Sequence, residues 1–253
     1  MRIEILGWVA SSLLYGPTPV TEATRRCDAI LSEVSGNLVA AAHVLQHLAG
    51  LHAMEGRFDR ARELLATSHA AFEELGLTLT AAAVHTAAGT VELLAGEPVA
   101  AERSLRRGYS ALEEMGERTV LSTTVALLAQ ALLAQQDEQQ AERFAALSEE
   151  LAAADDLVTQ VLWRGVRART LAGRGLIEEA ERLARQAVEL AERSDFVNDR
   201  GDAVFNLAIV QRQAGHLEEA GSALAEALRL YERKGNLVAA DRVRTELAAL
   251  TRV

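Results

Sequence analysis

A 21-residue block recurs along the chain at a nearly constant interval. "GRFDRARELLATSHAAFEELG" occupies residues 56–76, and "GEPVAAERSLRRGYSALEEMG" occupies residues 96–116. Further copies begin at Gln136, Gly175 and Gly215, and a weaker one lies in "TPVTEATRRCDAILSEV" near the N-terminus. Every copy has alanine in the sixth place, at positions 23, 61, 101, 141, 180 and 220, with spacings of 38, 40, 40, 39 and 40 residues. A period of this length predicts an array of similar structural units.

Each period contains two stretches of helical character. Ala and Leu dominate a chain that is 49% hydrophobic but only 4% aromatic and contains 3 Pro, so few residues favour strands. The repeated block is the second helix, and stretches such as residues 38–55, 79–95 and 120–136 precede it as the first helix. Glycines at positions 36, 76, 96, 116, 175, 215 and 235 mark the turns, because a helix end often needs a residue with positive φ. The sequence therefore predicts an all-α chain of helix pairs.

The alanine in the sixth place is predicted to lie where the two helices of a pair cross. Twelve residues earlier, in the first helix, stands another small residue: Ala49, Gly89, Ala129, Ala168 or Ala208. A leucine at such a crossing would overpack the pair and force the helices apart. One pair cannot cover its own apolar face, so we expect the pairs to stack side by side as a solenoid.

This pattern resembles the tetratricopeptide repeat family. The small residue, turn glycine, alanine and two further apolar or small residues of the family pattern correspond to Ala49, Gly56, Ala61, Leu65 and Ser68 in the second copy. The family period is about 34 residues, so these look like long-helix variants. The resemblance implies a right-handed α-α superhelix, a single domain over residues 1–253. Its repeats are expected at about 1–35, 36–76, 77–116, 117–155, 156–195 and 196–235, followed by a capping helix at 236–253.

Several short stretches give a closer resemblance. "YGPTPV" (15–20), "ALEEMGERTVLST" (111–123), "TQVLWRGVRA" (159–168) and "YERKGNLVAA" (231–240) look like the C-terminal tetratricopeptide region of large bacterial proteins. Those proteins carry an adenylate/guanylate cyclase domain, a signal-transduction ATPase domain, or both, ahead of that region. The resemblance implies a sensory or regulatory module of a bacterial signalling protein, excised from such a protein or standing alone.

Charge and cysteine usage exclude several classes of partner and location. The formal net charge is −10, from 26 basic and 36 acidic residues, so neither nucleic acid nor an anionic membrane is expected as the main partner. The N-terminus lacks the pattern of a secretory signal, and no apolar run reaches the roughly 18 residues that span a bilayer. The one cysteine, Cys27, is interpreted as a buried hydrophobe, and a cytoplasmic setting is expected.

Catalytic and metal-binding motifs are not found in the sequence. There is no G-x-x-x-x-G-K-[ST] loop for a nucleotide, and no Ser/His/Asp or Cys/His set at a suggestive spacing. His43 and His47 are four residues apart, a spacing that can hold a metal, with His52 further along. The motif "HVLQH" lacks the glutamate of H-E-x-x-H, so polar lining and inter-helix hydrogen bonds are the favoured interpretation. We therefore expect no enzymatic activity, no metal and no cofactor.

A basic stretch stands out in this acidic chain. "LWRGVRARTLAGRG" (162–175) contains Arg164, Arg167, Arg169 and Arg174. The arginines could bind a carboxylate-rich or phosphorylated peptide. The favoured interpretation is that they form ion pairs with glutamates of adjacent helices.

In a solenoid of this type the first helices are expected to line the concave face. The polar residues predicted to point into this groove are His43, Gln46, Thr86, Thr90, Thr123, Gln130, Arg169, Asp202 and Arg212. Such a mixed surface suits an extended peptide or a helix of a protein partner. Two alternatives are a homodimer formed through the terminal helices, including residues 237–253, and a small-molecule sensor.

Overall fold

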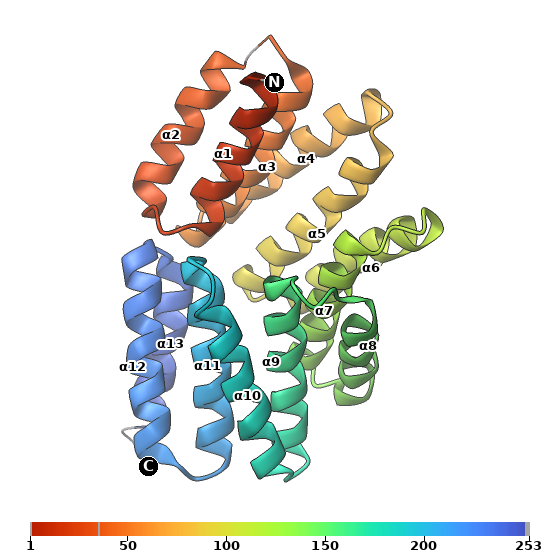
Figure 1. The fold of residues 1–253 in the computed structure, drawn as a ribbon. Helices are drawn as coiled ribbons and strands as arrows, with labels where there is room; N and C mark the ends of the chain where they lie inside the picture. The colour runs from red at the N-terminus through yellow and green to blue at the C-terminus, as the bar shows by residue number, and fades with distance from the viewer. Residues whose placement is uncertain (1, 35, 251–253) are drawn as a thin grey trace.

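The protein is a curled row of α-helices in a computed structural model that describes residues 2–34 and 36–250 (Figure 1). In chain order these are α1 Arg2–Tyr15, α2 Val20–Glu33, α3 Leu38–Met54, α4 Phe58–Glu74, α5 Thr78–Ala95, α6 Pro98–Glu114, α7 Thr119–Ala134, α8 Glu138–Leu151, α9 Leu157–Gly173, α10 Ile177–Ala191, α11 Val197–Gln213, α12 Leu217–Lys234 and α13 Leu237–Leu250. The described residues contain no strand. The predicted all-α solenoid is confirmed, whereas the one-domain division and repeat bounds remain predictions.

The helices pack as pairs that cross at the predicted small residues. The most extensive contacts join α3 to α4, α5 to α6, α7 to α8, α9 to α10 and α11 to α12. All six alanines of the sixth place are completely buried. A Cβ added to Gly89 of α5 would lie only 2.3 Å from Cγ of Leu105 in α6. The two helices therefore approach too closely there for any side chain on α5.

The turn inside each pair has the same backbone conformation even where its residue differs. Gly56, Gly96, Gly175 and Gly215 open their blocks with φ between 77° and 82°. In the block that begins at Gln136, this glutamine takes the place of the glycine, with φ 66°, and it is the one non-glycine residue of the described chain with positive φ. A residue with a side chain is disfavoured at positive φ. The packing shared by all the helix pairs therefore holds Gln136 in this conformation.

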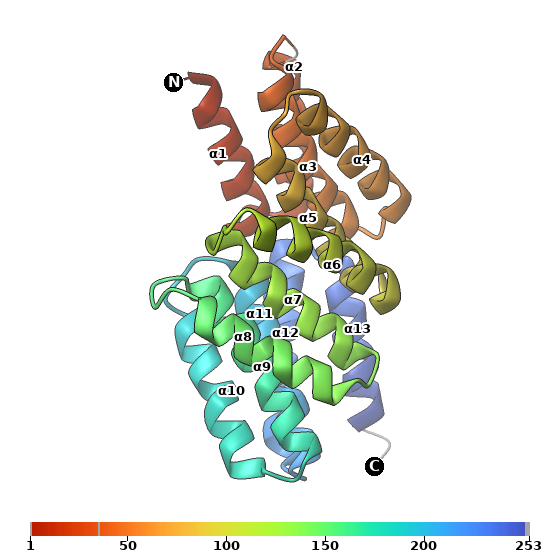
Figure 2. The ribbon, with the colours of Figure 1, turned by 90° about the vertical axis from the view of Figure 1, so that its right-hand side faces the viewer.

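The row curves because its two kinds of helix pack differently. Each first helix from α3 to α9 also contacts the first helix of the next pair. The second helices pack against the adjoining first helices, and no two of them make a contact of similar extent in the described structure. The first helices therefore form the shorter, inner side of the curve, and the pairs follow one another around the molecule (Figure 2).

The curl brings the two ends of the row together. Helix α13 packs on α12 and also contacts α3 and α5, and the end of α12 meets the turn between α1 and α2 (Figure 1). Lys234, the last residue of α12, is completely buried. Its Nζ donates hydrogen bonds to the backbone oxygens of Leu13 (2.9 Å), Gly16 (2.8 Å) and Thr18 (2.9 Å). We call this contact the Lys234 seam.

The Lys234 seam pairs a cation with the carbonyl groups at the C-terminal end of a helix. The last carbonyls of a helix have no intrahelical donors and carry partial negative charge, and Leu13 lies in the last turn of α1. Burial lowers the pKa of Lys234 to about 8, which still leaves the ammonium mostly protonated at pH 7. One cation, the sole lysine of the chain, therefore satisfies three acceptors.

The helix crossing generates a prediction about stability. Ala61→Leu should lower the free energy of unfolding by about 1–3 kcal/mol, because the added side chain has no space between α3 and α4. Ala66→Leu, on the exposed face of the same helix, should change it by less than about 0.5 kcal/mol. Denaturant unfolding followed by circular dichroism measures both. Equal effects of the two substitutions would contradict a close approach of α3 and α4 at Ala61.

The seam generates a second prediction. Lys234→Met keeps the length of the side chain but leaves three carbonyl oxygens without their donor. We expect a loss of about 1–3 kcal/mol, together with faster amide hydrogen exchange in α1 and α2. Arg233→Met, which changes the exposed neighbouring residue, is the matched control. Unaltered exchange in α1 and α2 of the Lys234→Met variant would show that the seam does not hold the ends together.

Candidate functional site

The histidines near the start of the inner surface are engaged in packing and hydrogen bonds. The His43 ring on α3 lies against Phe72 of α4, with 4.8 Å between the ring centroids. His47 bonds through Nδ1 to the backbone oxygen of His43 at 2.7 Å and packs edge-on against Tyr15. Burial lowers the pKa of both histidines, so both are neutral at pH 7.

Two further polar residues of this region lie on the same helix. His52 accepts a hydrogen bond at Nδ1 from Nε of Arg57 at 2.8 Å, and Gln46 is half-buried on α3. Among the side chains that the structure describes, no three of His, Cys, Asp and Glu are grouped so as to hold a metal ion.

The threonines predicted for the groove bridge successive first helices. Oγ1 of Thr86 on α5 lies 2.8 Å from Oγ1 of Thr124 on α7, and Thr123 on α7 makes the same contact with Thr159 on α9 at 2.7 Å. Thr90 donates to the backbone oxygen of Thr86. The hydroxyl groups of Thr86 and Thr123 are therefore already engaged in holding neighbouring helices together.

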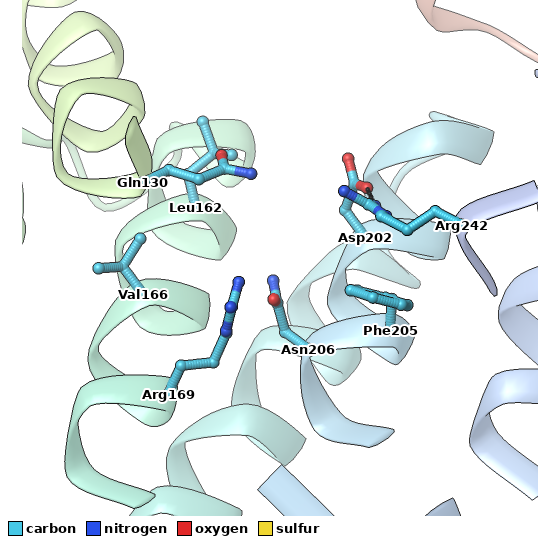
Figure 3. A pocket seen from close by; sticks show the side chains of 8 residues that line it. All are labelled: Gln130, Leu162, Val166, Arg169, Asp202, Phe205, Asn206 and Arg242. Atoms are coloured by element: carbon cyan, nitrogen blue, oxygen red, sulfur yellow. Dashed lines mark hydrogen bonds and ion pairs between the residues drawn. The ribbon is translucent and has the colours of Figure 1, made fainter. Parts of the chain in front are cut away.

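Three other predicted residues lie in or beside a hollow further along the inner surface (Figure 3). Gln130 of α7, Arg169 of α9 and Asp202 of α11 all line it. The residues that complete the lining are Leu162, Val166, Phe205, Asn206 and Arg242. Its deepest part has room for about two water molecules. The hollow thus joins four helices, α7, α9, α11 and α13.

Three side chains of the hollow have no hydrogen-bond partner within the described chain. Gln130, Arg169 and Asn206 come from three successive first helices, and none of them bonds to another described residue. Figure 3 shows Arg169 and Asn206 extending toward each other across the hollow. All three are only partly buried, so water or a ligand can reach their polar groups. We call these three side chains the open triad.

The backbone of α9 makes room for one member of the triad. A Cβ added to Gly165 would lie 2.6 Å from Nδ2 of Asn206. The amide of Asn206 can therefore rest on α9 only because residue 165 has no side chain. Gly165 thus helps to set the direction in which Asn206 points.

The other charged residues of this surface are paired. Arg212 on α11 donates to the carboxylate of Glu246 on α13. Arg242 lies 3.5 Å from Oδ1 of Asp202, and its guanidinium stacks over the Phe205 ring at 4.3 Å. The Asp202 carboxylate also accepts a 2.5 Å hydrogen bond from Tyr231. Side chains of Asp202 and Arg242 remain 42% exposed, so solvent reaches this surface.

The arginines of the basic stretch on α9 have different environments, and only some of them form the expected ion pairs. Arg167 pairs with Glu142 and Glu149 of α8, as favoured. Arg164 stacks over the Trp163 ring at 4.0 Å and donates to Gln160 on its own helix. Arg169 alone among these three points into the hollow. The arginines therefore do not form one continuous basic patch.

Sequence reasoning missed several residues of the hollow. Leu162 and Val166 could have been found from the helical spacing that places them near Arg169. Arg242 could have been found from the period, because it lies 40 residues after Asp202, its ion-pair partner. No sequence signal shows that Gly165 lies opposite Asn206.

Asp199 lies one turn before Asp202 on α11, close to the seam. Burial and the nearby Asp202 raise the pKa of Asp199 to about 7. Its Oδ2 is buried and has no partner among the described residues. Burial and the field of Asp199 also raise the pKa of Tyr15 to about 12. The first turn of α11 thus contains a buried carboxyl oxygen without a partner in the described chain and with a raised pKa.

The fold resembles those of several solved proteins. RapI in its apo form matches with a TM-score of 0.72 and 16% identity, over 92% of this chain and 84% of that one. NprR, a quorum sensor from B. thuringiensis, in complex with its cognate peptide NprX, matches with a TM-score of 0.68 and 11% identity, over 98% and 70% of the chains.

A third structure is a Rap protein complexed with Competence and Sporulation Factor. Its TM-score is 0.65 at 13% identity, over 87% of this chain and 62% of that one, so this chain spans less than two thirds of that protein. No protein-family model matches the sequence, and no curated protein does either. At these identities the likeness shows the fold, a helical solenoid of the tetratricopeptide kind.

The raised pKa of Asp199 generates a prediction about pH dependence. The folded pKa, about 7, is above the unfolded value of about 3.9, so the folded state binds this proton more tightly. The contribution of Asp199 to stability is therefore present below about pH 4 and is lost as pH rises through 7. Asp199→Asn should be as stable as wild type near pH 4 and more stable by about 1–3 kcal/mol at pH 8.

Denaturant unfolding at a series of pH values measures this difference. Asp195→Asn, in the exposed residue before α11, is the control and should differ little from wild type at either pH. A wild-type stability profile parallel to that of Asp199→Asn would refute the assignment.

Proposed function

We propose that the protein is a non-catalytic regulatory scaffold that binds a peptide, or an extended segment of a protein, along the inner surface of its curl. The observation that carries this proposal is the open triad. Gln130, Arg169 and Asn206 project into one hollow from three consecutive first helices, and their donors and acceptors lack partners in the described chain. Groups left in this way are satisfied by water or by a ligand.

The chemistry of the hollow matches a polypeptide. Side-chain amides offer one acceptor and two donors each, which suits the alternating carbonyl and amide groups of an extended backbone. Leu162, Val166 and Phe205 beside them supply apolar contact for ligand side chains. NprR, which shares the fold, is solved with its cognate peptide. The hollow has room for only about two water molecules, which argues against an enclosed metabolite, since such ligands are mostly buried in pockets of about 300–1,000 Å³.

The regulatory role rests on two further supports. NprR is a quorum sensor, and the short stretches at residues 111–123 and 159–168 resemble the C-terminal regions of bacterial cyclases and signal-transduction ATPases. We infer that the chain acts as the sensory module of a cytoplasmic signalling protein of that kind. No helix of the described chain is sufficiently long and apolar to cross a bilayer. Homodimer formation and small-molecule sensing remain the alternatives.

A selection of short random peptides displayed on phage tests the proposal. Peptides enriched on the wild-type protein should bind the double variant Gln130→Ala/Arg169→Ala about 10-fold or more weakly, because two groups of the open triad are removed. Fluorescence anisotropy with labelled peptides measures the affinities. The matched control is Gln139→Ala/Arg103→Ala, which removes the same residue types from exposed sites on α8 and α6.

The control variant should bind the peptides as wild type does. A selection that enriches no peptide would contradict the proposal. So would peptides that bind the two double variants equally well, since their site would then lie outside the hollow.

A further inference from the structure

The charged residues around the hollow leave one positive charge without a counterpart. Arg169, Arg212 and Arg242 supply three guanidinium groups, while Asp202 and Glu246 supply two carboxylates. Arg212 pairs with Glu246, and Arg242 lies next to Asp202. Arg169 has no ion pair or hydrogen bond with any described residue. The unmatched charge is therefore located at Arg169.

The surroundings of Arg169 disfavour its charge in the absence of a ligand. Burial lowers the pKa of Arg169, and the nearby Arg242 and Arg212 lower it further, while Glu246 partly opposes them. A guanidinium remains protonated in proteins, so Arg169 bears this unfavourable environment as a cation. A ligand anion would remove the penalty by pairing with it.

The size and the charge of the hollow select the kind of anion. A planar guanidinium binds a carboxylate with two parallel hydrogen bonds, and the hollow has room for about two water molecules, close to the size of two carboxylate oxygens. A phosphate group carries more than one negative charge near neutral pH and a third oxygen. The carboxylate of Asp202, which lines the hollow, would repel that extra charge.

We propose that Arg169 is the subsite for a carboxylate of the bound ligand, with the side-chain amides of Asn206 and Gln130 as additional donors. This inference rests on the proposed peptide-binding function and names the chemical group that the hollow selects. The carboxylate is supplied either by the C-terminus of a peptide or by an aspartate or glutamate side chain. Arg169 confers preference for acidic ligands, and Gly165 keeps Asn206 in position beside it.

Small probes test the subsite without any knowledge of the natural ligand. N-acetyl-alanyl-alanine presents a C-terminal carboxylate, and N-acetyl-glutamate methylamide presents a side-chain carboxylate. Their neutral counterparts are N-acetyl-alanyl-alanine amide and N-acetyl-glutamine methylamide. The readout is the Nε–Hε signal of Arg169 in NMR spectra of arginine-labelled protein, assigned by its loss in Arg169→Gln.

At least one acidic probe should shift this signal saturably at millimolar concentration, and its neutral counterpart should not. The probe that acts identifies the source of the carboxylate. The Nε–Hε signal of the exposed Arg103 is the internal control. No saturable shift with either acid, or equal shifts with an acid and its amide, would overturn the proposal.

Selected peptides provide the second measurement. Wild-type protein should bind an acidic peptide about 10–100-fold more tightly than the same peptide with its carboxylate replaced by an amide. This preference should disappear in Arg169→Gln, which lacks an unpaired cation and should be at least as stable as wild type. Peptides that depend on Gln130 and Asn206 but bind Arg169→Gln unchanged would overturn the carboxylate subsite and leave the peptide-binding function standing.

Discussion

The close crossing of two helices at a pair of small residues is the contact on which the whole structure depends. Six alanines spaced about 40 residues apart are completely buried, and five of them stand twelve residues after a small residue of the preceding helix. This contact holds every pair together and leaves larger apolar side chains to join one pair to the next. Because the same crossing recurs, the same small rotation accumulates from pair to pair. The curl, its inner surface and the meeting of its ends all follow from this repetition.

The repetition also explains why polar residues on different helices meet. Equivalent positions on successive first helices lie side by side on the inner face, so a residue one period away becomes a neighbour. Some of these positions are used for cohesion, as in the hydroxyl contacts of Thr86 and Thr123. Others, at Gln130, Arg169 and Asn206, are left without partners. The inner surface therefore combines a part that joins helices with a part that can receive a ligand.

The sequence was sufficient for features that depend on neighbouring residues and on the period. It predicted the helix pairs, the buried alanines and the turn conformation, which is now seen even at Gln136. It could not predict contacts between distant segments, because these depend on the total curvature of the row. Lys234 reaches α1 for this reason alone. Which inward residues are paired also had to come from side-chain geometry, as the contrast between Arg212 and Arg169 shows.

The Lys234 seam changes how the row of helix pairs can unfold from its ends. In an open array of repeats each unit interacts only with its nearest neighbours, so the terminal units have one interface and fray first. Here the last residue of α12 bonds to the segment that follows α1, and α13 contacts α3 and α5, which gives the array the connectivity of a ring. Unfolding from either end must first break the Lys234 seam, because this contact joins the two ends. The two termini are thereby coupled thermodynamically although more than 200 residues separate them along the chain.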